Sequence, residues 1–409
     1  MLSHSKIFTF AISTENILQF KVIEKDLSDL KLEEQEHELH ASLDELENRR
    51  WKNRLPLILF KLFQLGNNSC EIHIALSHFI SDEISAEIVL NEMSHAYVEY
   101  KAESETVGQQ ELVFYDYILH EQKDLNRNLS KNIDFWDNYL KNIPLLVFPQ
   151  NQILNRMNSS CTTYFEIPEN TLKGLRSFCK KNRVGIGDTL IAATGSILSP
   201  YINDKNKIAV INFVKSIREN ETYDNAVGLF VRNDVIKINL NQPNTLLELT
   251  KQVQDSRIEN YYYQSCPAII KIAFLLKKDW KNKKLGNFLI KLFAKIYTRV
   301  FYKYKLNYEI LLMFGRVFLA RKKHSFFVNI NILNHFIYDN SETKLFGFQQ
   351  KPLKAYHNDK LVERNVLNIW FDRDEHGKSY LIISGNLRSE FRNVIGFNLL
   401  KLLDSRSLQ

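Results

Sequence analysis

Strand-like and helix-like hydrophobic patterns alternate along the whole of this 409-residue chain. Residues 70–78 alternate apolar and polar side chains as a half-buried strand does, with Ile72, Ile74 and Leu76 predicted on its core face. Residues 84–100 then carry apolar side chains at helical spacing. The same mixing occurs in both halves, without a repeat or a linker rich in Pro, Gly or Ser. The fold class is therefore α/β or α+β.

The composition excludes several classes of protein. Hydrophobic residues make up 44% and charged residues 25%, as in a folded globular protein, and Gly (13) and Pro (8) are too few for a collagen-like chain. No stretch of about 18 residues is apolar and free of charge, so no membrane span is predicted. The N-terminus lacks the apolar core of a signal peptide, which predicts a cytoplasmic protein.

The four cysteines predict scattered thiols in a reducing compartment. They are Cys70, Cys161, Cys179 and Cys266. No pair has Cys-x-x-Cys spacing, and none is followed by His at the spacing of metal ligands. The sequence therefore predicts neither a disulfide framework nor a metal site.

Further elements are expected along the chain. A helix is predicted to begin at Gly187 with Asp188 as its N-cap. Val227–Val231 and Val235–Leu240 are predicted as two strands, and a long basic helical region is predicted at about 270–323. The remaining predictions are strands at 8–12, 18–23, 163–167, 208–213, 326–332, 366–372 and 380–384, and helices at 30–47, 133–140, 172–181, 246–257 and 391–403.

The sharpest local motif lies where the strand at 70–78 meets the helix that follows it. It reads Ser77-His-Phe-Ile-Ser-Asp82-Glu83. A histidine at such a junction can take a proton from an amine or hydroxyl that attacks a thioester, while the carboxylate of Asp82 fixes the loop. The alternative interpretation is a structural histidine followed by a helix-capping aspartate.

Several motifs together resemble the condensation-domain family of nonribosomal peptide synthesis, within the chloramphenicol-acetyltransferase-like acyltransferases. Its central His-His-x-x-x-Asp-Gly motif is similar to the segment from Ser77 to Glu83, so that His78 stands for the second His. The resemblance covers roughly residues 18–405. Its other parts are Leu55-Pro-Leu, Phe114-Tyr-Asp-Tyr117, Asp134-Phe-Trp-Asp-Asn-Tyr-Leu140 with Pro144 and Pro149, Val227-Gly-Leu-Phe-Val231, and Lys237 near an arginine of the family.

The resemblance implies two acetyltransferase-like lobes arranged as a V-shaped pseudo-dimer, with boundaries expected at 1–150 and 151–409. His78 would face a tunnel between the lobes, as a general base or as a group that stabilises the tetrahedral intermediate. Asp82 would be structural and pair with an arginine. The matching residue is Arg218, for which a solvated loop position is the alternative.

Three features depart from the family pattern. Ser77 replaces the first His, but cyclising terminal domains of the family show a Ser-His-x-x-x-Asp-x-x-Ser variant, which Ser77, His78, Asp82 and Ser85 match. Glu83 replaces a Gly that lies near the substrate backbone, where it would add bulk and charge. The family's first helix and its early Arg-His-Glu motif have no counterpart, so the chain is expected to be shortened at its N-terminus.

The resemblance implies a stand-alone acyltransferase of secondary metabolism that forms an amide or an ester. The donor would be a phosphopantetheine-linked or coenzyme A thioester, with an acyl or peptidyl carrier protein supplied in trans and no bound metal or redox cofactor. Two alternatives stay open. One is a catalytically degenerate module that recruits or scaffolds pathway proteins, favoured by Glu83 and the missing helix. The other is an O-acyltransferase that acts on a lipid alcohol.

The formal net charge of +7 is unevenly distributed. Residues 271–323 contain fifteen Lys or Arg and two acidic residues, a charge of +13 that leaves −6 for the rest of the chain. Within this segment Lys291, Lys295, Arg299 and Lys303 recur every four residues between large apolar residues, which predicts an amphipathic helix with a cationic stripe.

Three interpretations of this segment stay open. It could be a membrane-surface helix on anionic lipid, which would make the protein peripheral to a membrane. It could be a docking face for an acidic carrier protein or a phosphopantetheine phosphate. It could also be a packed helix with a solvated basic face. Nucleic acid is not an expected partner, because the rest of the chain is acidic and carries no nucleic-acid-binding motif.

Overall fold

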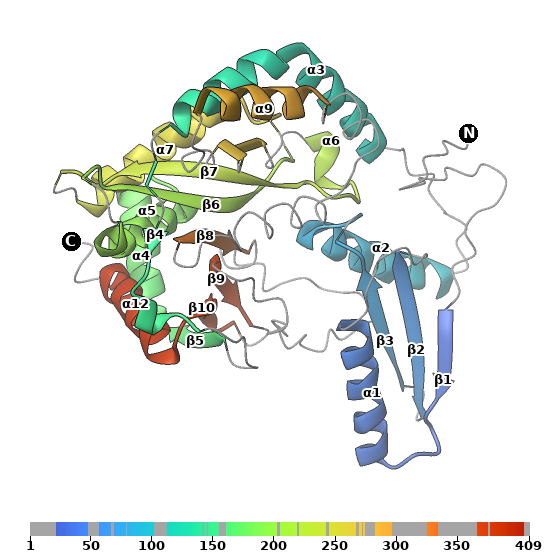
Figure 1. Cartoon of the computed structure of the whole chain (residues 1–409). Coiled ribbons are helices and arrows are strands. Elements are labelled where there is room, and N and C mark those ends of the chain that lie inside the picture. Colours follow the sequence, from blue (N-terminus) through green and yellow to red (C-terminus); the bar gives the residue numbers. More distant parts are fainter. Residues whose placement is uncertain are drawn as a thin grey trace.

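The computed structural model shows a smaller body built from the N-terminal elements beside a larger body built around a second sheet (Figure 1). It describes residues 22–47, 57–66, 69–78, 80–101, 113–141, 143–144, 146–154, 161–202, 205–218, 221–242, 245–266, 270–271, 273–274, 283–296, 325–333, 366–374 and 377–404. The strand predicted at 8–12 lies outside these residues.

The smaller body is a three-stranded sheet flanked by two helices. Its strands are β1 (Val22–Asp26), β2 (Ile58–Gly66) and β3 (Ser69–Leu76), with β1 parallel and β3 antiparallel to the central β2. The helices are α1 (Leu32–Glu47) and α2 (Glu83–Lys101). Strand β3 leads into α2 through a short turn, as the hydrophobic pattern predicts.

The burial of β3 differs from the expected one. His73 is buried, whereas Ile72, Ile74 and Leu76 are only half-buried. The His73 ring nitrogens lie 3.0 Å from Ser42 Oγ of α1 and 2.9 Å from a Glu71 carboxylate oxygen. The face of β3 that carries His73 can therefore be the buried one, because α1 and β3 supply polar partners for the ring. A buried polar ring must be hydrogen-bonded.

The larger body contains a seven-stranded sheet of order β5-β10-β9-β8-β6-β7, with β4 paired to β8 off this path. Pairs β6–β8 and β8–β9 are parallel, whereas β10 runs antiparallel to both β5 and β9. The strands are β4 (Leu146–Val147), β5 (Thr162–Ile167), β6 (Ile208–Ser216), β7 (Val231–Asn239), β8 (Ser325–Ile332), β9 (Val366–Arg373) and β10 (Ser379–Ser384).

Four helices cover one face of this sheet and form the main core with it. They are α4 (Glu169–Asn182), α5 (Ile186–Leu198), α7 (Leu246–Tyr261) and α12 (Ser389–Leu403). The N-cap of α5 is Gly185 and not Asp188, so that prediction is wrong. Asp188 lies in the first turn, is buried, and pairs with Arg257 of α7 at 2.6 Å, because an acid near a helix N-terminus is favourable without being the cap.

The opposite face of the sheet packs against α3 (Val113–Tyr139) and α9 (Lys283–Ile296). Trp136 of α3 is fully buried there and donates its indole N–H to the Tyr263 carbonyl oxygen at 3.0 Å. Helix α3 is much longer than the predicted 133–140. Its packing places the chain before residue 150 against the larger body, and the lobe boundary at 150 stays a prediction.

One other expectation is wrong, and another falls only partly on the described residues. Val227–Val231 is not a separate strand: β7 begins at Val231, and residues 227–230 are a loop. Within the basic region at 270–323, the structure describes a helix at Lys283–Ile296 and a few residues before it, and the remainder lies outside the described residues. A short helix, α6 (Glu221–Asp224), and two 3-10 turns, η1 (Gln150–Gln152) and η2 (Ser199–Tyr201), complete the described elements.

Candidate active site

The junction between β3 and α2 is held by hydrogen bonds from both sides. Asp82 precedes α2 and accepts a hydrogen bond from the Ser85 backbone N–H at 2.8 Å, the geometry of an N-cap. Before it, the Ser81 hydroxyl donates to the Ser77 carbonyl oxygen at 3.0 Å. Ser77, Ser81, Asp82 and Ser85 are all buried. The loop that carries His78 is therefore fixed at both ends.

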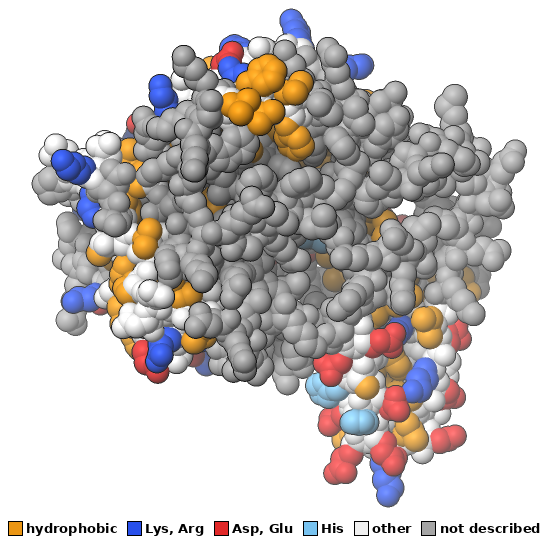
Figure 2. Space-filling model, viewed as in Figure 1, with side chains coloured by type: hydrophobic (Ala, Val, Ile, Leu, Met, Phe, Trp, Pro, Cys, Tyr) orange, Lys and Arg blue, Asp and Glu red, His pale blue; other side chains and the backbone are white. Residues whose placement is uncertain are grey.

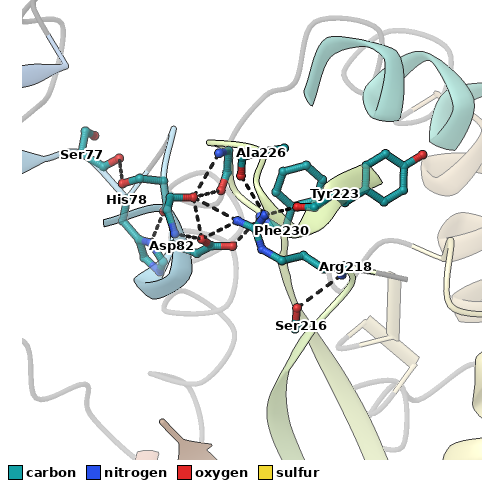
Figure 3. Close-up of polar contacts among 11 residues, drawn as sticks. Ser77, His78, Asp82, Ser216, Arg218, Tyr223, Ala226 and Phe230 are labelled. Atoms are coloured by element: carbon teal, nitrogen blue, oxygen red, sulfur yellow. Dashed lines mark hydrogen bonds and ion pairs between the residues drawn. The ribbon is translucent and has the colours of Figure 1, made fainter. Parts of the chain in front are cut away.

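His78 is exposed, unlike the other residues of this junction that the structure describes. Its Nδ1 lies 2.7 Å from the Ser81 carbonyl oxygen (Figure 3). Because a carbonyl oxygen only accepts, Nδ1 carries the proton of the neutral ring and Nε2 carries the lone pair. The backbone thus sets the orientation and the tautomer of an accessible imidazole, which is the arrangement that a general base requires.

Arg218 of the larger body forms an ion pair with Asp82 (Figure 3). Its Nη2 lies 3.0 Å from Asp82 Oδ1, and both side chains are almost fully buried, at 3% and 2% exposed. Nη1 donates to the carbonyl oxygens of Ala226, at 2.7 Å, and Tyr223. The structure thus brings together the two residues that the resemblance paired, and the solvated-loop alternative for Arg218 does not hold.

Ser85 and the loop at 227–230 complete the contact between the two bodies. The Gly228 N–H donates to the Ser85 hydroxyl at 3.0 Å, and the Phe230 N–H donates to Asp82 Oδ2 at 2.9 Å. The Ser85 hydroxyl also lies 2.7 Å from the Gly228 carbonyl oxygen and 2.6 Å from Asp82 Oδ1. We call Asp82, Ser85, Arg218, Gly228 and Phe230 the junction cluster.

The sequence does not indicate these backbone partners, although the Val-Gly-x-Phe-Val motif contains them. The hydrophobic pattern predicts a strand at Val227–Val231, in which the amides would pair with a neighbouring strand. As a loop, the same amides are free to bind the carboxylate of Asp82 and the hydroxyl of Ser85.

An aromatic cluster supports the junction cluster from the larger body. The Arg218 guanidinium lies 4.3 Å from the centroid of the Phe230 ring, which packs edge-on against Phe114 of α3. Tyr117 packs against Phe230 and Tyr223. A Cβ added to Gly228 would lie 2.3 Å from the Phe114 ring, so glycine is the residue that lets α3 approach here.

Glu83 is the first residue of α2 and is half-buried. A carboxylate in the first turn is favourable for the helix dipole, so the replacement of glycine is compatible with the local structure.

The start of the basic segment is not a basic surface. Lys271 is fully buried and its Nζ lies 2.7 Å from Asp234 and 4.1 Å from the centroid of the Trp136 ring. Burial raises the pKa of Asp234, but the charges of Lys271 and Lys215 outweigh it and hold this pKa below its usual value. Lys271 therefore belongs to a buried ion cluster and cannot meet an external anion.

This mixed α/β fold is that of solved condensation domains, the chloramphenicol-acetyltransferase-like fold. A family model of the condensation domain matches residues 10–290, more than half of the chain, so the chain belongs to the condensation-domain family of nonribosomal peptide synthesis.

Solved structures share this fold at low sequence identity. The first condensation domain of the CDA synthetase has a TM-score of 0.57 at 11% identity, over 94% of this chain and 75% of that one. The epimerization domain from the third module of tyrocidine synthetase B gives 0.59 at 16% identity, over 95% and 80%. The X-domain from the complex of the X-domain and OxyB in teicoplanin biosynthesis gives 0.59 at 15%, over 95% and 76%.

Curated relatives are much longer than this chain. Surfactin synthase subunit 1 of Bacillus subtilis is 24% identical over 216 residues, which are 52% of this chain but 6% of that protein. Phosphinothricin tripeptide synthetase of Streptomyces viridochromogenes is 20% identical over 52% of this chain and 18% of its own length. Among the described residues, no helix is both long and apolar enough to cross a membrane.

Proposed function

We propose that this chain is a condensation-type acyltransferase that joins an amine or a hydroxyl to an acyl group carried as a thioester. The observation that carries the proposal is His78, an exposed imidazole whose Nδ1–H is fixed by the Ser81 carbonyl oxygen at 2.7 Å. That hydrogen bond leaves the lone pair on Nε2, where it can accept a proton from the attacking group. The donor is a phosphopantetheine-linked or coenzyme A thioester, and we propose that the carrier protein acts in trans.

In the proposed reaction the acceptor nitrogen or oxygen attacks the thioester carbonyl carbon. Its proton passes to His78 Nε2 as the new C–N or C–O bond forms, or His78 stabilises the charged tetrahedral intermediate. The C–S bond then breaks, and the leaving sulfur receives the proton to become a thiol. Asp82 and Arg218 act as positioning residues, because both side chains are buried and pair with each other in the junction cluster.

A second function, the recruitment of pathway proteins by a degenerate module, is favoured by two observations. Glu83 places a half-buried carboxylate next to Asp82, at a position that the family fills with glycine. A structure of the same fold, an X-domain, is described in complex with OxyB. The orientation of His78 favours catalysis over this alternative.

The test is genetic and chemical. A host strain that lacks this protein is complemented with the parent, with His78→Ala or with His95→Ala, and the metabolites lost on deletion are measured by mass spectrometry. Removal of a general base costs about 10²–10⁴-fold in rate. We therefore expect His78→Ala to leave the metabolites missing. His95, an exposed histidine on α2, is the matched control and is expected to restore them.

Restoration of the metabolites by His78→Ala would contradict the catalytic proposal and would leave recruitment as the function. In that case Glu83→Gly, which restores the residue of the family, is expected to change nothing. The fold of each purified variant is checked by its circular dichroism spectrum, so that a misfolded protein is not taken for an inactive one.

A further inference from the structure

Helix α9 presents a row of exposed apolar side chains on the outside of the larger body. Leu285, Phe288, Leu289 and Leu292 follow one another at helical spacing and are 52%, 62%, 42% and 42% exposed. Figure 2 shows a hydrophobic patch where Figure 1 places α9. We call these four residues the α9 stripe.

The other side of α9 fixes this orientation. Ile290 is 3% exposed and lies in the apolar cluster that α3 forms with the sheet, and Phe293 packs against the same cluster. Lys291 Nζ lies 2.6 Å from the Asp134 carboxylate of α3. The helix therefore has a buried face, and the α9 stripe is a second apolar face on its exposed side.

Three lysine positions of α9 share one register next to the α9 stripe. Lys284, Lys291 and Lys295 occur at intervals of seven and four residues, so their backbone positions follow one line along the helix, next to that of Phe288, and Lys291 is the one that pairs with Asp134. The segment that contains α9 has a net charge of +13, while the rest of the chain has −6. A row of apolar side chains with lysine positions along its edge is complementary to an anionic bilayer, whose charged headgroups cover apolar acyl chains.

We propose that the α9 stripe is a membrane-surface contact that inserts into a bilayer containing anionic lipid. The proposal does not depend on the proposed function. Four large apolar side chains side by side suit acyl chains better than the more polar surface of an acidic carrier protein. A carrier must also dock where its thioester reaches His78, and α9 lies over α3, on the outside of the larger body and away from the β3–α2 turn (Figure 1).

The experiment is co-sedimentation of the purified full chain with vesicles of equal parts phosphatidylglycerol and phosphatidylcholine. We expect the parent to bind at low salt, and to bind about tenfold less to vesicles of phosphatidylcholine alone or in salt at roughly 0.5 M. Phe288→Ser is expected to lower the affinity for the anionic vesicles about tenfold. Phe397→Ser on α12 is the matched control, because Phe397 is also 62% exposed, and it is expected to bind like the parent.

The charge is tested separately. Lys284→Gln/Lys295→Gln is expected to weaken binding to anionic vesicles, whereas Lys180→Gln/Lys181→Gln, an equal change of charge at exposed positions of α4, is expected not to. Failure of the parent to sediment at low salt would overturn the proposal. So would equal binding by Phe288→Ser, or a dimer of the parent that Phe288→Ser converts to a monomer, since the stripe would then be an interface between two copies.

Discussion

At the scale of one residue, the partners of the Asp82 carboxylate show what this residue of the motif does. Its Oδ1 accepts from the Ser85 N–H and from Arg218, and its Oδ2 accepts from the Phe230 N–H. The structural interpretation of the motif, a helix-capping aspartate, is therefore correct for Asp82. It does not exclude a chemical role for His78, because the same cap fixes the loop on which the imidazole lies.

The cysteines give a prediction at the same scale. Burial raises the pKa of the Cys266 thiol to about 12 and raises that of Cys179, so both thiols stay protonated at pH 8. Cys161 is also buried, whereas Cys70 is exposed. Because the thiolate is the reactive form, iodoacetamide at pH 8 is expected to modify the native chain once, at Cys70.

Intact-mass measurement followed by peptide mapping checks this result. The same chain in urea is the control and is expected to take four adducts, since all four cysteines are free thiols. Modification of Cys266 in the native chain as fast as Cys70 would contradict the burial that the structure assigns to it.

At the scale of elements, α7 is the helix whose start is best defined. Thr245 Oγ1 accepts from the Glu248 N–H at 3.2 Å, and Glu248 accepts from the Thr245 N–H at 2.7 Å, a capping box. Leu249 and Val253 of α7 are buried in the main core. Thr245→Ala is expected to lower the free energy of unfolding by about 1 kcal/mol, because the cap is lost.

Denaturant unfolding measures this effect, with Thr245→Ser as the matched control that keeps a capping hydroxyl. We expect the serine variant to unfold at nearly the concentration that unfolds the parent. An alanine variant as stable as the serine variant would show that the capping box does not hold the start of α7.

Elements with a strong local pattern could be predicted from the sequence, and elements defined by distant contacts could not. The periodicity of 84–100 gives α2 because its apolar spacing is local, and the alternation of 70–78 gives β3. The loop at 227–230 and the covered face of His73 depend on partners far along the chain, namely Asp82 and Ser42. Likewise, the motif indicates His78 as a base, but only the structure shows the carbonyl oxygen that fixes its tautomer.

In the part of the chain that the structure describes, two sheets are joined through the junction cluster. Arg218→Ala would leave the Asp82 carboxylate buried without its ionic partner, which costs about 3 kcal/mol or more. We therefore expect a lower melting temperature and faster hydrogen exchange at the Ser85 and Phe230 amides. Amides of β10, which lie far from the junction in the larger sheet, are expected to exchange as in the parent (Figure 1).

Lys378→Ala provides the control for this prediction. It removes another ion pair, with Glu166, in which both side chains are more than half exposed. Such a surface pair adds little to stability, so the melting temperature is expected to stay close to that of the parent. Equal melting temperatures for Arg218→Ala and Lys378→Ala would show that the junction cluster does not hold the two bodies together.

The junction cluster also limits how such proteins can be recombined. The cap of α2 is shared, since Asp82 and Ser85 come from one half of the chain while Arg218, Gly228 and Phe230 come from the other. A chimera that exchanges residues 22–101 alone brings a foreign carboxylate to a resident guanidinium. In such a chimera Arg218 and Phe230 come from the recipient. The loop that carries the histidine keeps its shape only if the donor protein has the same number of residues between its own equivalents of Arg218 and Phe230. The unit of exchange is therefore two distant segments of sequence and not one lobe.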